Sequence, residues 1–89
     1  MITTNITIIN KLGLHARAAA KFVAVASKYL CEIQVKKDGQ SVNGKSIMGV
    51  MMLAASKGTN LELIFDGEDE VEMNKAIVDL INNRFGEEE

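Results

Sequence analysis

The sequence predicts an α+β fold in which a four-stranded antiparallel sheet carries three helices on one face. Two observations lead to this fold class. Along the 89 residues the spacing of apolar residues switches between two and about 3.6, in the order β-α-β-β-α-β-α. The strand-like segments are apolar at alternate positions only, so the second face of the sheet is expected to remain open. We therefore expect an open-faced sandwich formed by a single domain over residues 1–89.

The first strand is predicted over residues 2–8, where isoleucines and Thr4 alternate with threonine and asparagine. A helix is predicted from Ala16 to about Tyr29, because small and apolar residues recur at helical spacing. The residues expected on its apolar face are Ala19, Val23, Ala26 and Leu30. The strand therefore leads into a short loop that ends at the start of a helix.

A hairpin is predicted next. Its first strand contains alternating apolar residues at Cys31, Ile33 and Val35, and Asp38-Gly39 is typical of a two-residue hairpin turn. The returning strand is expected over residues 40–43.

A short helix is expected after Ser46, a residue type favoured at the N-cap. It is predicted to extend to Leu53 or Ala55, and its residues 47–53 are apolar on every side. Val50 and Leu53 are expected to face the sheet. Two interpretations stay open for its other apolar residues: a surface for protein contacts, or a helix buried on two sides. These residues are Ile47, Met48, Met51 and Met52.

The last strand and the last helix complete the predicted fold. The strand covers residues 60–65 and directs Leu61, Leu63 and Phe65 inward. A helix is predicted over residues 68–85 from apolar residues that recur at helical spacing: Met73, Ala76, Ile77, Leu80, Ile81 and Phe85. Gly86 and the three final glutamates are expected to form a solvated tail.

Composition limits the possible functions. The net charge is −2, so the chain lacks the basic character of most nucleic-acid-binding proteins. The single cysteine, Cys31, excludes an intrachain disulfide, and the sequence shows no Cys/His cluster typical of a metal site. No secretory signal or membrane-length apolar run is present. We expect a cytoplasmic protein without metal or cofactor, whose partners are proteins or small anions.

His15 is the only histidine of the chain and lies at the predicted start of the first helix. The first N–H groups of a helix, here including that of Ala16, have no partner within the helix and favour a nearby anion. A neutral imidazole is a nucleophile toward phosphorus, and the guanidinium of Arg17 is suited to phosphate oxygens. The site could therefore hold a phosphoryl group on His15. A surface cap or a packing residue is the more common role of a lone histidine at a helix start and stays open as the alternative.

Residues 39–46 match the phosphate-binding pattern G-x-x-x-x-G-K-[ST] and raise the alternative of a nucleotide-binding enzyme. That function requires one continuous loop between a buried parallel strand and a helix, whereas here Gly39 lies in a hairpin turn and a strand separates the two glycines. An RNA-binding module shares the β-α-β-β-α-β order. The four aromatic residues do not form the stacking pair that such modules use: Phe22, Tyr29, Phe65 and Phe85.

Two segments resemble a known family. Residues 13–17 (Gly-Leu-His-Ala-Arg) and 43–49 (Asn-Gly-Lys-Ser-Ile-Met-Gly) are similar to the two signature segments of the HPr phosphocarriers of the bacterial phosphotransferase system. The resemblance covers essentially the whole chain in length, element order and the spacing of the two segments. It implies a covalent carrier of phosphoryl groups rather than an independent catalyst.

The resemblance also implies residue roles and partners. His15 would accept a phosphoryl group on Nδ1 from phospho-enzyme I, which draws on phosphoenolpyruvate, and would pass it to an enzyme IIA. Arg17 would stabilise the phosphorylated ring, and Ser46 would be phosphorylated by HPr kinase/phosphorylase. Ile47, Met48 and Met51 would belong to the surface on which partners dock. We expect the carrier to act as a monomer.

The chain differs from the family pattern at Ala18, where the family usually has proline. Proline there would rigidify the first helical turn without taking part in the chemistry. A paralogous phosphocarrier of the nitrogen-regulatory branch has the same histidine chemistry and remains the alternative. The segment Lys45-Ser46-Ile47-Met48 favours the serine-regulated type.

Overall fold

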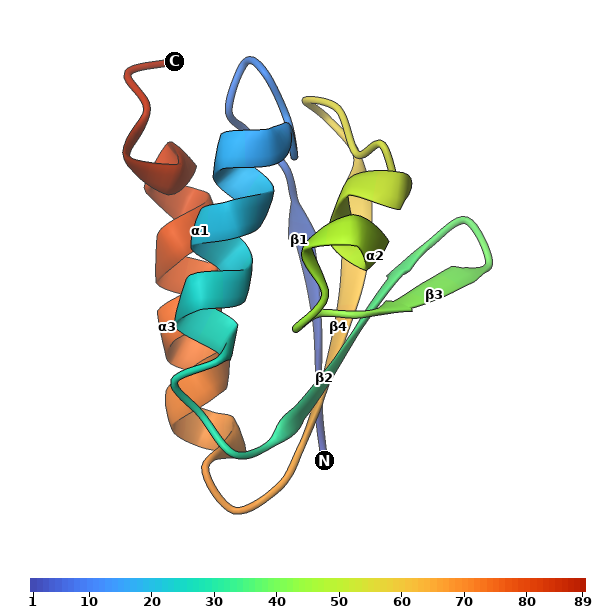
Figure 1. Cartoon of the computed structure of the whole chain (residues 1–89), viewed down its shortest axis with the longest axis vertical. Helices are drawn as coiled ribbons and strands as arrows, with labels where there is room; N and C mark the ends of the chain where they lie inside the picture. Colours follow the sequence, from blue (N-terminus) through green and yellow to red (C-terminus); the bar gives the residue numbers. More distant parts are fainter.

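The computed structural model describes all 89 residues and confirms the predicted fold class and element order. Figure 1 shows the helices and strands along the chain. They are β1 (Ile2–Thr7), α1 (Ala16–Ala26), β2 (Glu32–Lys37), β3 (Gln40–Asn43), α2 (Ile47–Met52), β4 (Asn60–Asp66), α3 (Glu70–Asn82) and a 3-10 turn, η1 (Arg84–Gly86).

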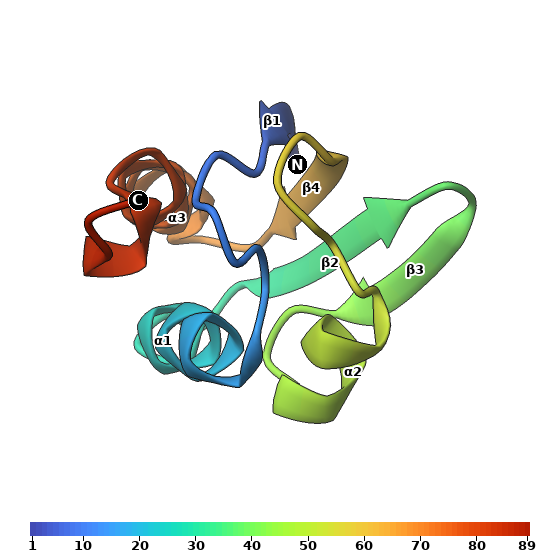
Figure 2. The ribbon, with the colours of Figure 1, turned by 90° about the horizontal axis from the view of Figure 1, so that it is seen from above.

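The four strands form one antiparallel sheet in the order β1-β4-β2-β3. Residues buried on alternate positions of β2 and β4 give the sheet one apolar face, as the alternating pattern predicts. The three helices lie on that face, and the view from above shows them as one layer over the strands (Figure 2). A core of 19 buried residues lies between the sheet and the helices.

The predicted hairpin is confirmed. Asp38 and Gly39 have φ values of 47° and 84°, the left-handed conformation that a tight two-residue hairpin turn requires. Residues 40–43 form β3, which pairs with β2. The segment from Gly39 to Ser46 is therefore a turn, a strand and a helix cap, and does not form a continuous phosphate-binding loop.

The first helix is shorter than predicted. It ends at Ala26, and Leu30, expected on the apolar face, is 88% exposed. The carboxylate of Asp69 accepts hydrogen bonds from the N–H groups of Leu30 and Cys31, both at 2.8 Å, and so fixes this segment as a turn. The periodicity missed two residues of the apolar face, Ala18 and Phe22, which are both fully buried.

The last helix also ends early, and this changes the position of the C-terminus. α3 ends at Asn82, and Arg84 and Phe85 both adopt φ values of 55°, which turn the chain back on itself. Phe85 is buried as predicted. The chain end then lies beside the start of α1 (Figure 1). Glu88 and Glu89 are exposed as predicted, whereas Glu87 is hydrogen bonded to Asn10 and His15, so the prediction of a solvated tail is wrong for Glu87.

Two further features agree with the predictions. Ser46 caps α2, since its hydroxyl accepts a hydrogen bond from the N–H of Gly49 over 3.1 Å. Val50 and Leu53 are buried, whereas the remaining apolar residues of this helix are exposed, and these are Ile47, Met48, Met51 and Met52.

No helix combines the length and the apolar character of a membrane span.

Candidate functional site

The loop between β1 and α1 places His15 at the helix start through two backbone features. Gly13 has a φ of 67°, and a Cβ there would collide with the backbone of Ala55 and Ser56. The N–H of Leu14 donates to the carbonyl oxygen of Ala55 over 2.8 Å. Because Gly13 permits this close approach, the loop is fixed against the segment that follows α2.

His15 is the N-cap residue of α1, with extended backbone angles, and its side chain does not cap the helix. Its carbonyl oxygen accepts the first helical hydrogen bond, from the N–H of Ala19. The N–H groups of Ala16, Arg17 and Ala18 have no acceptor. These three donors and the helix dipole provide positive potential beside the histidine, as the sequence predicted.

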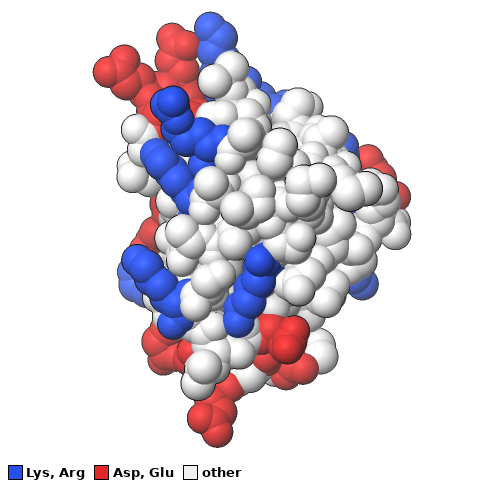
Figure 3. Space-filling view, viewed as in Figure 1, with Lys and Arg blue, Asp and Glu red and all other residues white.

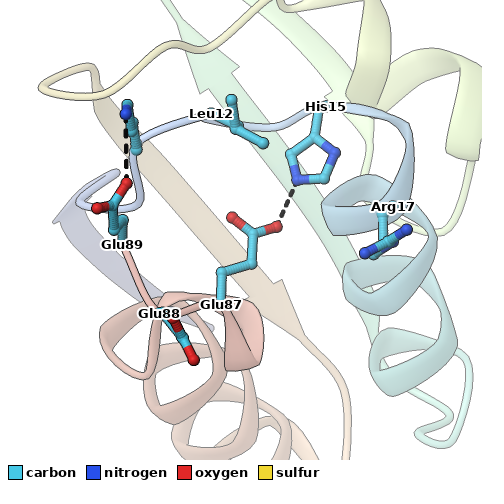
Figure 4. Close-up of a pocket in the computed structure, with 7 residues that line it drawn as sticks. Leu12, His15, Arg17, Glu87, Glu88 and Glu89 are labelled. Atoms are coloured by element: carbon cyan, nitrogen blue, oxygen red, sulfur yellow. Dashed lines mark hydrogen bonds and ion pairs between the residues drawn. The ribbon is translucent and has the colours of Figure 1, made fainter.

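The His15 side chain is 28% exposed and opens onto a surface hollow of about 520 Å³. The hollow is lined by Lys11, Leu12, His15, Arg17, Glu87, Glu88 and Glu89 (Figure 4). Arg17 is exposed and forms no ion pair, so its guanidinium is available to an incoming anion. The structure brings together the predicted site residues His15, Ala16 and Arg17.

Glu87 is a site residue that sequence analysis did not identify. Its Oε2 is hydrogen bonded to Nε2 of His15, and no other group bonds to the ring. A hydrogen bond from Asn10, together with the hydrogen bond and charge of His15, holds the pKa of the Glu87 carboxyl below its usual range. No spacing rule links residues 15 and 87, and a run of terminal glutamates usually indicates a solvated end.

Asn10 supports both partners of this contact. Its Nδ2 donates to the carbonyl oxygen of Gly13 over 2.8 Å and to Oε1 of Glu87 over 2.9 Å. Both donors of the amide are thereby used, and the side chain is completely buried. Asn10 therefore connects the histidine loop to the C-terminal segment.

The second predicted region lies on α2, which packs against α1. Met48 and Met52 are each 70% exposed, and Ile47 and Met51 are also on the surface. Figure 3 shows a broad area without charged side chains over this part of the molecule, with basic side chains on the side of α1. Ser46 lies at the edge of this apolar surface. Of the two interpretations that the sequence left open, these exposures exclude a helix buried on two sides.

Comparison with known proteins places this geometry in a family. The model for "PTS HPr component phosphorylation site" matches residues 2–83. The chain belongs to the HPr family. It is 63% identical to the phosphocarrier protein HPr of Pseudomonas aeruginosa over the whole length of both chains.

Solved HPr structures share the fold. HPr-C-His from Thermoanaerobacter tengcongensis superposes with a TM-score of 0.96 at 53% identity, and the alignment covers all of both chains. The structure of an HPr dimer from the same organism superposes with a TM-score of 0.79 at 53% identity, and the alignment covers 98% of this chain and 100% of that chain. The chain is accordingly an HPr-type phosphocarrier of the phosphotransferase system. Glu87 lies beyond the residues that the family model matches.

Proposed function

We propose that the chain carries a phosphoryl group on Nδ1 of His15, taken from phospho-enzyme I and passed to an enzyme IIA. The observation that supports this most directly is the position of a partly exposed imidazole beside three unpaired N–H groups and a free guanidinium. Nε2 of the ring is hydrogen bonded to Glu87, whereas no protein group bonds to Nδ1. In Figure 4 the nitrogen not bonded to Glu87 faces the start of α1 and Arg17.

The transfer is a substitution at phosphorus. The lone pair of Nδ1 forms the new N–P bond, while the bond from phosphorus to the donor breaks and its electron pair leaves with the donor. Such transfers require mainly in-line positioning and stabilisation of charge on the phosphoryl oxygens. The N–H of Ala16 and the guanidinium of Arg17 are suited to that second role. Onward transfer is the same substitution with the enzyme IIA as acceptor.

The openness of the site fits a carrier. A phosphohistidine that must meet two different proteins has to be reached from solvent, and the hollow around His15 is shallow and bounded on one side by the chain end (Figure 4). All the site residues come from one chain, so we propose that the carrier acts as a monomer. Size-exclusion chromatography at the concentration used for transfer assays tests this point.

Regulation by phosphorylation of Ser46, through HPr kinase/phosphorylase, is part of the proposal. Ser46 is partly exposed and precedes the apolar surface of Ile47, Met48 and Met51. A phosphate at the N-cap is compatible with the helix, but it adds negative charge where an apolar contact with a partner is proposed. It would therefore weaken docking without unfolding the protein.

Incubation with enzyme I and labelled phosphoenolpyruvate tests the proposed function. We expect the wild-type chain to become labelled with acid-labile phosphate and the His15→Ala variant to remain unlabelled while it keeps its fold. Circular dichroism checks the fold of the variant. Labelling of His15→Ala at the wild-type rate would contradict the proposal.

A further inference from the structure

The fold fixes the position of Glu87 beside His15. The chain reverses at Arg84 and Phe85, and buried Phe85 anchors the reversal. Lys21 Nζ donates to the carbonyl oxygen of Phe85 over 2.6 Å. Beyond Glu87, the N–H of Lys11 donates to the carbonyl oxygen of Glu89 over 2.9 Å. The backbone is thus held on both sides of Glu87.

Side-chain hydrogen bonds also fix the orientation of the Glu87 carboxylate. Oε1 accepts from Nδ2 of Asn10, and Oε2 faces Nε2 of His15. The orientation of the Asn10 amide is unambiguous, because both groups that it contacts, the Gly13 carbonyl and Glu87, are acceptors. The two oxygens of Glu87 therefore have different, fixed partners.

An ionised carboxylate can only accept hydrogen bonds, so the proton in the contact with His15 belongs to Nε2. A neutral imidazole with its proton on Nε2 has its lone pair on Nδ1. We propose that Glu87 is a positioning residue for phosphoryl transfer, which holds His15 in the tautomer with the proton on Nε2 and so leaves Nδ1 as the nucleophile. This inference rests on the proposed function for its catalytic consequence, whereas the tautomer itself can be measured independently of that function.

The same contact has a second effect during the transfer. When Nδ1 forms the N–P bond and Nε2 keeps its proton, the ring gains a positive charge. The carboxylate of Glu87 stabilises that charge, and its Asn10 partner keeps it in place. A carboxylate plays the same two roles toward the histidine of a serine protease triad, by fixing the tautomer and stabilising the charged ring.

The variant Glu87→Gln tests this inference because glutamine has nearly the same shape as glutamate but can reverse the direction of the hydrogen bond with Nε2 of His15. Asn10 is a donor, so the amide oxygen of the glutamine will remain on Asn10 and its NH₂ will face Nε2 of His15. Nε2 must then accept, which moves the ring proton to Nδ1 and occupies the nucleophilic position. Glu72→Gln is the matched control, since it removes the same charge from an exposed carboxylate on α3, outside the hollow around His15.

The tautomer is measured by ¹⁵N NMR of the ring nitrogens in the unphosphorylated chain, at a pH where the titration shows the ring to be neutral. We expect the proton on Nε2 in the wild type and in Glu72→Gln, and on Nδ1 in Glu87→Gln. Unchanged amide spectra away from residues 10–17 and 84–89 will show that the fold is retained. A Glu87→Gln spectrum with the proton still on Nε2 would overturn the inference.

Transfer from phospho-enzyme I gives the second readout. We expect Glu87→Gln to accept the phosphoryl group about tenfold more slowly or worse, the scale at which histidines respond to loss of a carboxylate partner. Glu72→Gln is expected to accept the phosphoryl group at the wild-type rate. An inverted tautomer with an unchanged rate would also overturn the inference. Failure of the proposed function itself would appear differently, as absence of transfer to the wild type.

Discussion

The N–H of Leu14 donates to the carbonyl oxygen of Ala55 over 2.8 Å, and this hydrogen bond joins the loop that presents His15 to the segment that follows α2. The histidine and the proposed docking helix are thereby fixed relative to each other. Gly13 makes the approach possible, since a side chain at this position would overlap the backbone of Ala55 and Ser56. The geometry of the site therefore depends on a residue that takes no part in the chemistry.

Gly13→Ala is expected to lower the free energy of unfolding by about 2–4 kcal/mol, because it combines a left-handed backbone with a backbone overlap. Gly58→Ala is the matched control: its φ is 89°, but a Cβ there meets nothing within 4 Å. It should cost only about 1–2 kcal/mol. Denaturant unfolding of both variants measures the difference, and equal losses would show that the contact with Ala55 is unimportant.

Ala18→Pro tests the departure from the family pattern. Ala18 lies in the first turn of α1, and its N–H has no acceptor, so a proline there removes no hydrogen bond. We expect the free energy of unfolding to rise by about 0.4–1 kcal/mol, through lower entropy of the unfolded chain. Thermal unfolding measures the effect. A lower Tm for the variant would mean that the loop around His15 does not accommodate the ring.

Asp69 should make the stability depend on pH. The N–H of Leu30, followed by that of Cys31, donates to its carboxylate and holds its pKa below the usual range. Because the pKa is lowered in the folded state, this stabilisation is complete above the ordinary pKa of an aspartate and is lost as the pH falls through the lowered value.

The variant Asp69→Asn is expected to be less stable than the wild type at pH 7, with a difference that shrinks as the pH is lowered below about 4. Denaturant unfolding at a series of pH values measures this. Glu68→Gln, which removes a neighbouring carboxylate without any hydrogen bond, should show no such trend. A difference that is constant with pH would exclude a stabilising role of the ionised Asp69 carboxylate as acceptor for Leu30 and Cys31.

Substitutions of Ser46 can separate the effect of negative charge at this position from the effect of capping α2. Asp and Asn both cap helices well, so Ser46→Asp and Ser46→Asn should retain α2, whereas Ser46→Ala should cost about 0.5–2 kcal/mol. Only Ser46→Asp places a negative charge beside Met48, and we expect only this variant to raise the KM of enzyme I for the carrier. Equal kinetics for the aspartate and asparagine variants would argue against an interface at this surface.

Much of the fold was predictable because its signals are local. The alternation in β2 and β4, the turn at Asp38-Gly39 and the cap at Ser46 each depend on residues close in sequence, and the structure confirms them. His15 and Arg17 were identified for the same reason, since both lie within one turn of a helix start.

The errors concern segments that distant residues control. Leu30 continues the helical spacing of α1. Its N–H, however, donates to the carboxylate of Asp69, 39 residues away, and this hydrogen bond stabilises a turn instead of a longer helix. Phe85 continues the spacing of α3, yet the chain turns there through positive φ values at two residues that are not glycine. The return of Glu87 to His15 follows from that turn, so no local pattern of residues indicates this contact.

The central claim, that Nδ1 of His15 carries the phosphoryl group, is tested most directly on the phosphorylated protein. The chain is labelled with ¹⁵N in histidine, phosphorylated with enzyme I and phosphoenolpyruvate, and observed for coupling between phosphorus and the ring nitrogens. We predict coupling to Nδ1 of His15, with the proton on Nε2. Phosphorus bonded to Nε2, or a phosphorylated chain with no phosphorus on the histidine, would contradict the account.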